Sequence, residues 1–250
     1  MVLCSDVMVV VPHYSYTQNI PLIVSELSEH FEIIVVNDGS DSLKHEGVTI
    51  LKTEGLGFSG AVNVGLSYAQ SHGKKWGFIL NDDAFILSDS LNDFVSNIEK
   101  VGLYAPVLIS KNRKCYGFSV SFWGRVHELR NKNRKPDALC GAALLVPAWM
   151  RFDATFLHGM EDIELSLRAQ SLGLNIQTYE NTFAFHKEGK TISKHSYEAQ
   201  KGACFGQMYL FPRYALSVGI LSTLQVLKEG RNKSKRLKAI LEAFKMFRKR

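Results

Sequence analysis

The first hundred residues alternate short apolar runs with segments of helical pattern. The apolar runs are nearly continuous in Val and Ile, which is typical of strands buried on both faces of a parallel sheet. Alternation of strand and helix favours an α/β domain with right-handed crossovers. The pattern predicts strands at 7–14, 31–40, 48–53 and 76–85, and helices at 20–30, 59–71 and 91–101.

The second half of the chain is less regular. It predicts strands at 103–110, 114–122, 142–149 and 176–186, a helix at 161–173 and helices from residue 197 to the end. The 161–173 helix has acidic residues in its first turn and Gly173 as its stop. The basic, Asn-rich stretch 130–137 predicts a mobile loop. We therefore expect an α/β domain over 1–195 and a basic helical extension over 196–250.

Composition is that of an ordinary globular protein, with 46% hydrophobic and 22% charged residues. The apolar run Val7–Val11 is too short for a transmembrane helix, and no basic stretch precedes it as in a secretory signal. The four cysteines form no CxxC pair, which argues against a disulfide framework or a structural zinc site. We therefore expect a reducing, cytoplasmic location.

The net charge of +6 is unevenly distributed. Residues 228–250 hold ten Lys and Arg against two Glu, and residues 111–135 hold eight against one. Two local basic patches predict local anionic partners, such as phosphates or a membrane surface. For the loop within 125–135 we expect ordering over a bound ligand, with a solvated loop of no such role as the alternative.

The last predicted helix is amphipathic. Lys and Arg occupy most of its polar positions. Its apolar positions share one face of the helix, and they are Leu237, Ile240, Leu241, Phe244 and Phe247. Such a helix can lie in a membrane interface, with its cations near anionic lipids. Alternatively the same face packs on its own domain or on a partner subunit in a homo-oligomer. Both interpretations stay open.

Three polar clusters follow predicted strands, at 12–14, 37–40 and 81–83. Ligands of open α/β sheets bind at the carboxyl ends of strands. In these clusters Tyr14 can stack on a base, and Asp38, beside a glycine turn, can accept from a pyrimidine N3–H. Successive polar residues Asn81, Asp82 and Asp83 suit Mg²⁺ or Mn²⁺ on a diphosphate. The alternative for the cluster at 37–40 is a simple tight turn, and the alternative for the cluster at 81–83 is a helix N-cap region.

Three further features of the sequence are candidates for a functional role. GLGFSG at 55–60 matches the dinucleotide fingerprint, but a complete strand–helix unit precedes it, and the fingerprint normally opens the first. Glu161 and Asp162 begin a helix, where paired carboxylates suit general-base work and also simply complement the helix dipole. His186 follows an apolar run and is either a metal ligand or a core histidine.

Taken in order, these segments resemble glycosyltransferase family 2, the inverting nucleotide-sugar transferases of GT-A fold, and most closely its rhamnosyltransferase-like members. The similarity runs from about Val7 to Ser193. It rests on these segments: VVVPHY, VVNDGSD, GFSGAVNVGL, LNDDA, CGAALLVPAWM, HGMEDIELSLRAQSLGL and FHKEGKTIS. The resemblance implies a mostly parallel central sheet flanked by helices, with the helical extension following it.

The resemblance also implies roles. Asp83 and His186 would hold Mn²⁺ or Mg²⁺, and Asp162 would be the base, with Glu161 orienting the acceptor. The donor nucleotide would be bound by eight residues: Pro12, Tyr14, Asp38, Gly39, Gly60, Asn63, Asn81 and Asp82. Three departures weaken the match: Asn81 in place of the first Asp of Asp-x-Asp, Asn37 before Asp38, and Glu164 in place of a common Asp.

The expected activity is transfer of a hexosyl or deoxyhexosyl group from a UDP- or dTDP-sugar to a glycan or lipid-linked oligosaccharide, as in surface polysaccharide synthesis. We expect no nucleic-acid partner. Peripheral attachment to the inner face of the cell membrane is a further expectation. The alternatives are a nucleotidyltransferase acting on sugar phosphates and an inactive membrane-associated scaffold.

Overall fold

The computed structural model describes residues 2–15, 17–39, 43–111, 113–122, 124–156, 159–187, 196–229 and 232–248. Its strands are β1 (Val7–His13), β2 (Glu32–Asn37), β3 (Thr49–Lys52), β4 (Trp76–Leu80), β5 (Ala84–Phe85), β6 (Gly102–Ser110), β7 (Arg113–Cys115), β8 (Phe118–Val120), β9 (Val126–Glu128), β10 (Ala143–Pro147) and β11 (Asn175–His186). Its helices are η1 (Cys4–Asp6), η2 (Thr17–Asn19), α1 (Ile20–Leu27), α2 (Gly57–Ser71), α3 (Ser88–Ser96), α4 (Glu161–Ser171), α5 (Tyr197–Leu210), η3 (Pro212–Tyr214), α6 (Ala215–Glu229) and α7 (Lys233–Arg248).

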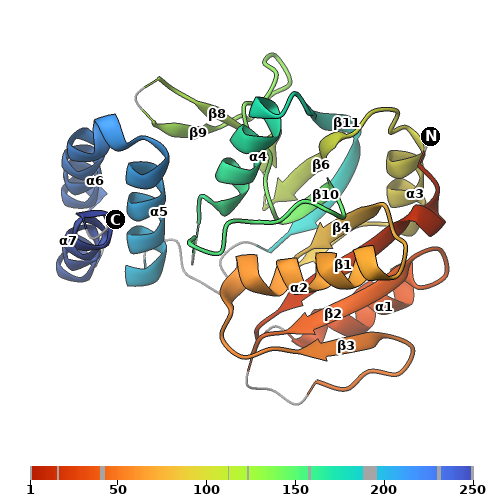
Figure 1. The fold of residues 1–250 in the computed structure, drawn as a ribbon. Helices are drawn as coiled ribbons and strands as arrows, with labels where there is room; N and C mark the ends of the chain where they lie inside the picture. Colours follow the sequence, from red (N-terminus) through yellow and green to blue (C-terminus); the bar gives the residue numbers. More distant parts are fainter. Residues whose placement is uncertain are drawn as a thin grey trace.

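The main sheet has the order β3-β2-β1-β4-β10-β6-β11-β5, with β7 paired to β6, and β8 and β9 form a separate hairpin (Figure 1). Strands β3, β2, β1 and β4 are parallel, as the alternation of strand and helix predicted. Strand β10 enters antiparallel between β4 and β6, and β11 then runs parallel to β6. The predicted α/β class with a central sheet flanked by helices is confirmed, and the sheet is mixed, not wholly parallel.

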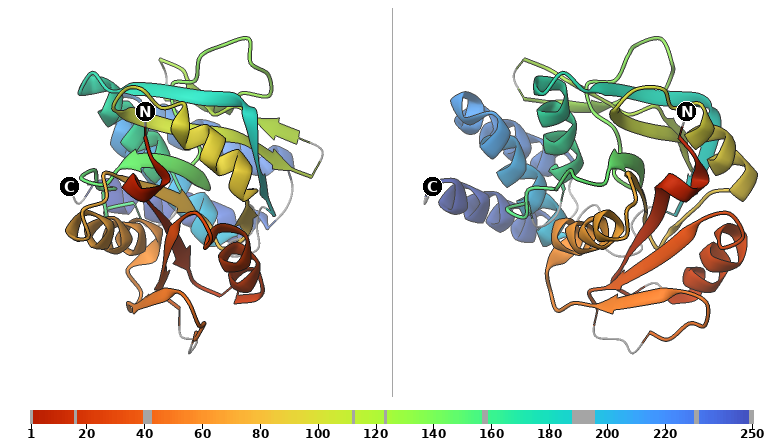
Figure 2. Two further views of the ribbon diagram at one scale, coloured as in Figure 1. Left: turned by 90° about the vertical axis from the view of Figure 1, so that its right-hand side faces the viewer. Right: turned by 45° about the vertical axis from the view of Figure 1, so that its right-hand side comes forward.

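Helices cover both faces of the sheet, and alternate side chains of β1 point into the two layers. Val9 lies in the hydrophobic core with residues of α1 and α3. Val10 lies in a second core with residues of α2 and α4. Because successive strand residues face opposite sides, a continuous apolar run serves both cores at once. Figure 2 shows α2 and α1 on opposite sides of the strands.

The predicted strand 76–85 is divided in two, which decides where its polar residues lie. It pairs as β4 up to Leu80, and residues 81–83 then turn, with the Ala84 N–H donating to the Asn81 carbonyl at 2.9 Å. Beyond the turn, β5 pairs with β11 instead of β10. The turn places Asp82 and Asp83 at the edge of the sheet rather than within a strand.

The helical extension has a hydrophobic core of its own. Helices α5, α6 and α7 share a cluster that includes Phe205, Met208, Val226 and Ile240. Ile240 is 3% exposed, and the partly buried Leu237, Phe244 and Phe247 pack on the same cluster. Of the five apolar positions of the last helix, Leu241 alone is exposed. The face considered for membrane contact is therefore packed within the extension, as in the alternative interpretation.

Within the described chain no single helix is both long and apolar enough to cross a membrane. One strongly bent pair, Tyr197–Leu210 with Pro212–Glu229 at 116°, reaches the threshold by length and composition alone.

The extension packs against the turn that precedes α4 (Figure 1). Phe156 and Tyr209 meet edge to face with ring centroids 5.4 Å apart. A Cβ added at Gly206 of α5 would lie 2.6 Å from the Cβ of Met160. Met160 itself has a left-handed backbone (φ 75°) and directly precedes Glu161. The extension thus supports the first turn of α4, while the predicted domain boundary at 195/196 stays a prediction.

The basic loop 130–137 forms no helix or strand. Lys132 pairs with Glu180 at 3.3 Å, and Arg134 pairs with Asp137 at 2.9 Å. Glu180 lies in the irregularity of β11 between Tyr179 and Phe183, which pair with the adjacent residues Pro106 and Val107 of β6. That the loop within 125–135 orders over a bound ligand stays a prediction.

Candidate active site

The polar clusters predicted from the sequence meet at one edge of the sheet. Strands β2, β1 and β4 are adjacent and parallel, so residues 37–39, 12–14 and 81–83 follow one another along their carboxyl ends. Strand β10 begins beside them, because the Asn81 N–H donates to the Ala142 carbonyl at 2.9 Å. Strand β11 ends beside β5, where His186 pairs with Ala84. The topology therefore brings distant segments to the place where open α/β sheets bind ligands.

Asp38 is buried and its carboxylate is engaged by the glycine-rich loop. Oδ1 accepts from the Thr53 hydroxyl at 2.8 Å and from the Leu56 N–H at 2.9 Å, and Oδ2 accepts from the Gly57 N–H at 2.7 Å. These N–H groups open α2, where a dinucleotide fingerprint would bind its pyrophosphate. Because Asp38 already occupies them, the dinucleotide interpretation of GLGFSG loses its anion site. A contact from Asp38 to a pyrimidine stays a prediction.

Tyr14 and Gly39 lie against each other at the ends of β1 and β2. A Cβ at Gly39 would collide with the Tyr14 backbone carbonyl, so a larger residue at position 39 would displace this loop. The Tyr14 side chain is 57% exposed, whereas Pro12 is buried within β1. An exposed ring held beside a glycine turn is available for stacking on a base. Ser40, the last residue of this cluster, lies outside the described residues.

His13 and Asp82 form a buried pair that the sequence pattern did not indicate. His13 Nδ1 lies 2.8 Å from Asp82 Oδ2, and the Tyr14 N–H donates to the same oxygen at 3.4 Å. Both side chains are almost fully buried. Asp82 therefore fixes the loop that carries Tyr14. The three polar residues after an apolar strand were a signal for a site here, but nothing in the sequence paired His13 with the second of them.

Asp83 and His186 are brought together by the pairing of β5 with β11. His186 Nε2 lies 3.1 Å from Asp83 Oδ1, and the Lys187 N–H donates to the Asp83 carbonyl at 2.9 Å. Two ligands at right angles around a small divalent cation, each about 2.1 Å from it, would be about 3.0 Å apart. The pair fits two ligands of one cation. No group of three or more such side chains occurs among the described residues, so the remaining ligands would come from phosphates or water.

Gly60 and Asn63 have partners that differ from the donor contacts predicted for them. The Asn63 Nδ2 donates to the Phe152 carbonyl at 2.9 Å, and its Oδ1 accepts from the Phe152 N–H at 2.7 Å. This two-sided bond fixes α2 to the segment after β10. A Cβ at Gly60 would lie 2.6 Å from the Leu56 Cβ, so Gly60 serves the close turn into α2. These contacts indicate that both residues stabilise the fold around α2. Their predicted contacts with the donor stay predictions.

Asp162 is held at the start of α4 by the loop before β10. Its Oδ2 accepts from the Gly141 N–H at 3.0 Å, and its Oδ1 accepts from the Ile163 N–H at 2.9 Å. Burial raises the pKa of the Asp162 carboxyl, and these two backbone N–H groups act in the opposite direction. Each oxygen keeps a second lone pair for a ligand. The carboxylate is therefore fixed in orientation and still able to accept a proton.

Glu161, beside it, carries a carboxyl of very different character. Burial, and then the charge of Asp162, raise the pKa of Glu161 to about 8. One of its oxygens, Oε2, is buried without a hydrogen-bond partner. Two adjacent carboxyls whose pKa values are perturbed by burial are typical of catalytic sites. Glu164, one turn further on, instead pairs with Arg168 at 2.7 Å.

Buried polar atoms without a partner gather at this edge of the sheet. Five such side-chain atoms occur among the described residues, and four belong to residues at the ends of β1, β4 and β6 or at the start of α4: His13 Nε2, Asn81 Oδ1, Ser110 Oγ and Glu161 Oε2. Such groups are rare in folded proteins because each costs free energy. Their concentration in one place indicates that a polar ligand completes their hydrogen bonds.

Comparison with known protein families agrees with this arrangement. A family model described as "Glycosyl transferase family 2" matches residues 8–144, more than half of the chain. The chain belongs to glycosyl transferase family 2. The matched segment includes β1 to β4 and most of the edge just described. It ends before α4 and β11, so the contributions of Asp162 and His186 rest on the structure and on the motif resemblance.

Solved structures share the fold of this family member. A crystal structure of GalNAc-T7 with UDP, GalNAc and Mn²⁺ superposes with a TM-score of 0.62 and 12% identity. The match covers 84% of this chain but 48% of that one, so the chain spans about half the length of this neighbour. The GT-A fold is thereby confirmed. No curated protein matches the sequence.

Proposed function

We propose that this family member is an inverting glycosyltransferase that moves a hexosyl or deoxyhexosyl group from a UDP- or dTDP-sugar to a hydroxyl of a glycan or lipid-linked glycan. The observation that carries the proposal is the meeting of three groups at one edge of the sheet. These groups are an exposed aromatic beside a glycine turn, a carboxylate–imidazole pair, and a carboxylate held by a backbone N–H. A nucleotide sugar and its acceptor need those three functions together.

The nucleoside would lie over the ends of β1 and β2, with its base on the Tyr14 ring. Base stacking on an aromatic side chain is typically worth roughly 1–3 kcal/mol. Asp82 would act here through His13 and the Tyr14 loop, since its carboxylate is engaged with both. Asn81, whose Oδ1 is buried without a partner, would complete its hydrogen bonds with the ribose or diphosphate.

Asp83 and His186 would hold Mn²⁺ or Mg²⁺ at the donor diphosphate. When bound, such a cation neutralises charge that develops on the departing diphosphate. The support in this chain is the separation of the two side chains, 3.1 Å, and the mixed oxygen and nitrogen donor set. The neighbouring GalNAc-T7 structure contains UDP and Mn²⁺ together.

Asp162 would take the proton from the acceptor hydroxyl as its oxygen attacks the anomeric carbon. The new bond forms on the face opposite the departing diphosphate, so a single displacement inverts the configuration. General-base assistance of this kind contributes roughly 10²- to 10⁴-fold in rate. Glu161, with a pKa of about 8, is protonated at neutral pH and can donate a hydrogen bond to the acceptor.

We also propose a cytoplasmic location for this chemistry. None of the four cysteines, all of which lie within the described residues, forms a disulfide, and burial raises the pKa of the Cys204 thiol to about 11. The absence of disulfides among these cysteines suits a chain folded in a reducing compartment. Synthesis of surface polysaccharide on a lipid-linked acceptor is the pathway we propose for it.

The proposal is tested by binding and turnover of nucleotide sugars. Calorimetric titration with UDP, dTDP and GDP, each with Mn²⁺, would identify the base, and hydrolysis or transfer would then be measured with the corresponding sugars. We expect one nucleoside diphosphate to bind only with metal and its sugar to be turned over. Failure of all three to bind would overturn the proposal. Metal-dependent binding without turnover of any sugar, with acceptor extracts present, would favour an inactive scaffold.

A further inference from the structure

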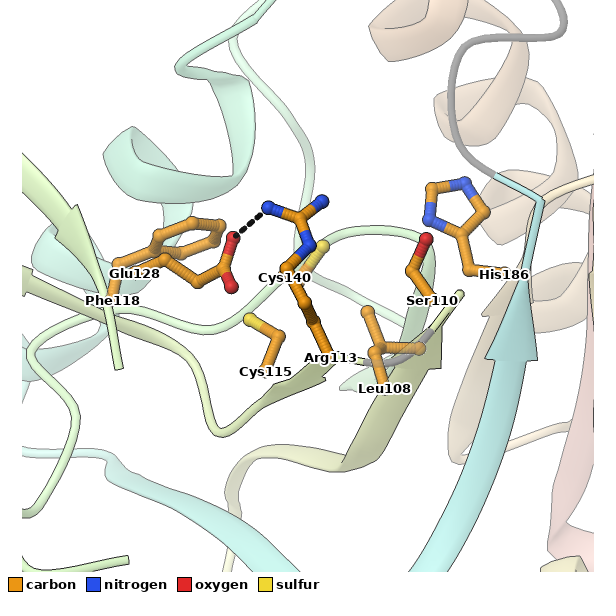
Figure 3. A pocket seen from close by; sticks show the side chains of 8 residues that line it. All are labelled: Leu108, Ser110, Arg113, Cys115, Phe118, Glu128, Cys140 and His186. Atoms are coloured by element: carbon orange, nitrogen blue, oxygen red, sulfur yellow. Dashed lines mark ion pairs between the residues drawn. The ribbon is translucent and has the colours of Figure 1, made fainter. Parts of the chain in front are cut away.

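A cavity of about 100 Å³ lies between the two ends of the proposed site. It is enclosed by the end of β6, by β7, by the β8–β9 hairpin and by the end of β11 (Figure 3). Its position is defined by two of its lining residues. His186 belongs to the pair proposed to hold the diphosphate, and Cys140 precedes Gly141, whose N–H holds Asp162. A group in this cavity therefore lies next to the diphosphate on one side and to the base on the other.

The walls of the cavity combine apolar surface with a few polar groups. Leu108, Phe118 and the thiols of Cys115 and Cys140 supply soft, largely apolar surface. The Ser110 hydroxyl is almost fully buried, lines the cavity and has no hydrogen-bond partner. This composition suits a ring with one apolar face and several hydroxyls around its edge.

An ion pair closes the side of the cavity away from the sheet. Arg113 of β7 and Glu128 of β9 approach to 4.0 Å. Figure 3 marks this ion pair with a dashed line. A carboxylate and a guanidinium together can accept from and donate to sugar hydroxyls. The volume corresponds to about three waters, so the cavity holds part of one sugar ring and excludes an oligosaccharide.

We infer that this cavity binds the glycosyl group of the donor, and that Ser110 hydrogen-bonds one of its hydroxyls. The inference rests on the proposed function, because it takes the diphosphate to lie at Asp83 and His186. The sugar is the part of the donor attached directly to that diphosphate, so it occupies the adjoining cavity. Ser110 and the Arg113–Glu128 pair then determine which sugar is accepted, while the residues at β1 and β2 determine the nucleoside.

The first test separates the nucleoside diphosphate from the sugar. Ser110→Ala is titrated with Mn²⁺ and UDP or dTDP, whichever the protein binds, and with the tightest-binding sugar of that nucleotide. We expect the affinity for the free diphosphate to change less than about twofold, and that for the sugar nucleotide to fall roughly 3- to 30-fold, as for loss of one hydrogen bond. The matched control is Ser71→Ala, on the exposed end of α2, which should change neither.

The second test measures occupancy without a mutation. Cys115 and Cys140 line the cavity and are partly buried, so alkylation by N-ethylmaleimide, followed by mass spectrometry, reports access to it. The sugar nucleotide should slow alkylation of both thiols several-fold more than the free diphosphate does. Cys4, in η1, serves as the internal reference and should react at the same rate throughout.

The outcomes distinguish this inference from the proposed function. If no nucleoside diphosphate binds, the proposed function itself fails and the inference fails with it. If the diphosphate binds but Ser110→Ala weakens it as much as the sugar nucleotide, the cavity is not specific for the sugar and the inference is overturned. The inference is likewise overturned if the sugar nucleotide protects the thiols no better than the diphosphate, or if an acceptor glycan alone protects them. In those last cases the proposed function still stands.

Discussion

His186 Nε2 lies 3.1 Å from Asp83 Oδ1, although the two residues come from opposite halves of the chain. The pairing of β5 with β11 creates this contact, and both strands are exposed to the site only at their ends. Asp83 is almost fully buried and the His186 side chain is 17% exposed, so each gives the other a polar partner in a largely buried place. Because the pair also lies beside the ends of β4 and β11, we propose that the two side chains are metal ligands.

Replacing Asp83 should therefore abolish metal-dependent binding without unfolding the protein. We expect Asp83→Ala to lose the Mn²⁺-dependent part of nucleoside diphosphate affinity and to turn over no donor. Calorimetry with and without chelator measures the first effect. Asp89→Ala, an exposed carboxylate of the first turn of α3, is the matched control and should behave as the wild type. Retention of metal-dependent binding by Asp83→Ala would show that the cation lies elsewhere.

Replacing Asp162 should lower the rate of transfer and leave the affinity for the donor nearly unchanged. Asp162→Asn keeps one oxygen for the Gly141 N–H but cannot accept a proton, so we expect kcat to fall roughly 10²- to 10⁴-fold. The affinity for the sugar nucleotide should stay within about threefold, since the base acts on the acceptor. Pre-steady-state turnover and donor titration on the same preparation provide both values. Equal losses in affinity and rate would place Asp162 in the donor site instead.

Asp38 should stabilise the fold more than it selects the base. Its carboxylate accepts three hydrogen bonds from residues 53–57, so Asp38→Asn should lower the free energy of unfolding by about 1–3 kcal/mol. Urea unfolding measures this effect, and titration at a temperature where the variant is folded measures nucleotide affinity. A variant as stable as the wild type that has lost affinity for uracil nucleotides, but not for GDP, would support the base contact implied by the family resemblance.

The periodicity of the chain was sufficient to predict the first half of the fold. Continuous Val and Ile runs separated by helical segments correctly placed β1, β2, β4 and α2, because a strand buried on both faces leaves a simple pattern. The same rule could not predict that β10 would enter antiparallel, since its pattern AALLVP is equally apolar in either direction. Strand direction depends on the connections, and the described residues between β6 and β10 form strands and loops but no helix.

The sequence predicted which polar residues lie at the candidate site, but it predicted few of the contacts that they make. Polar residues after apolar strands pointed to the correct edge, because exposed strand ends are where such residues can be accommodated. The partners of Asp38 and Asn63 could not be predicted, since each bonds backbone groups whose positions depend on the fold. His13 was missed because its partner, the Asp82 side chain, lies 69 residues away in the sequence. Ser110 was missed because in the sequence it resembles the ordinary end of a strand.

Glu161 should make the stability of the protein depend on pH in a direction opposite to that of most carboxylates. Its pKa in the folded protein is about 8, against an ordinary value of 4.5, because burial and the charge of Asp162 disfavour ionisation. Between these values the folded protein holds a proton that the unfolded chain has released. The corresponding contribution to stability is complete below about pH 4.5 and is lost as the pH rises to 8.

Glu161→Gln removes this titration while keeping the size of the side chain. We therefore expect the wild type to lose more stability than Glu161→Gln between about pH 5 and pH 8, as measured by urea unfolding at both pH values. The exposed Glu99→Gln is the control and should follow the wild type, because its carboxyl is solvated in both states. The variant need not be independent of pH, since burial also raises the pKa of Asp162. Parallel pH dependence in wild type and Glu161→Gln would mean that Glu161 ionises in the folded protein as it does in water, and would remove the basis for its role as a hydrogen-bond donor to the acceptor.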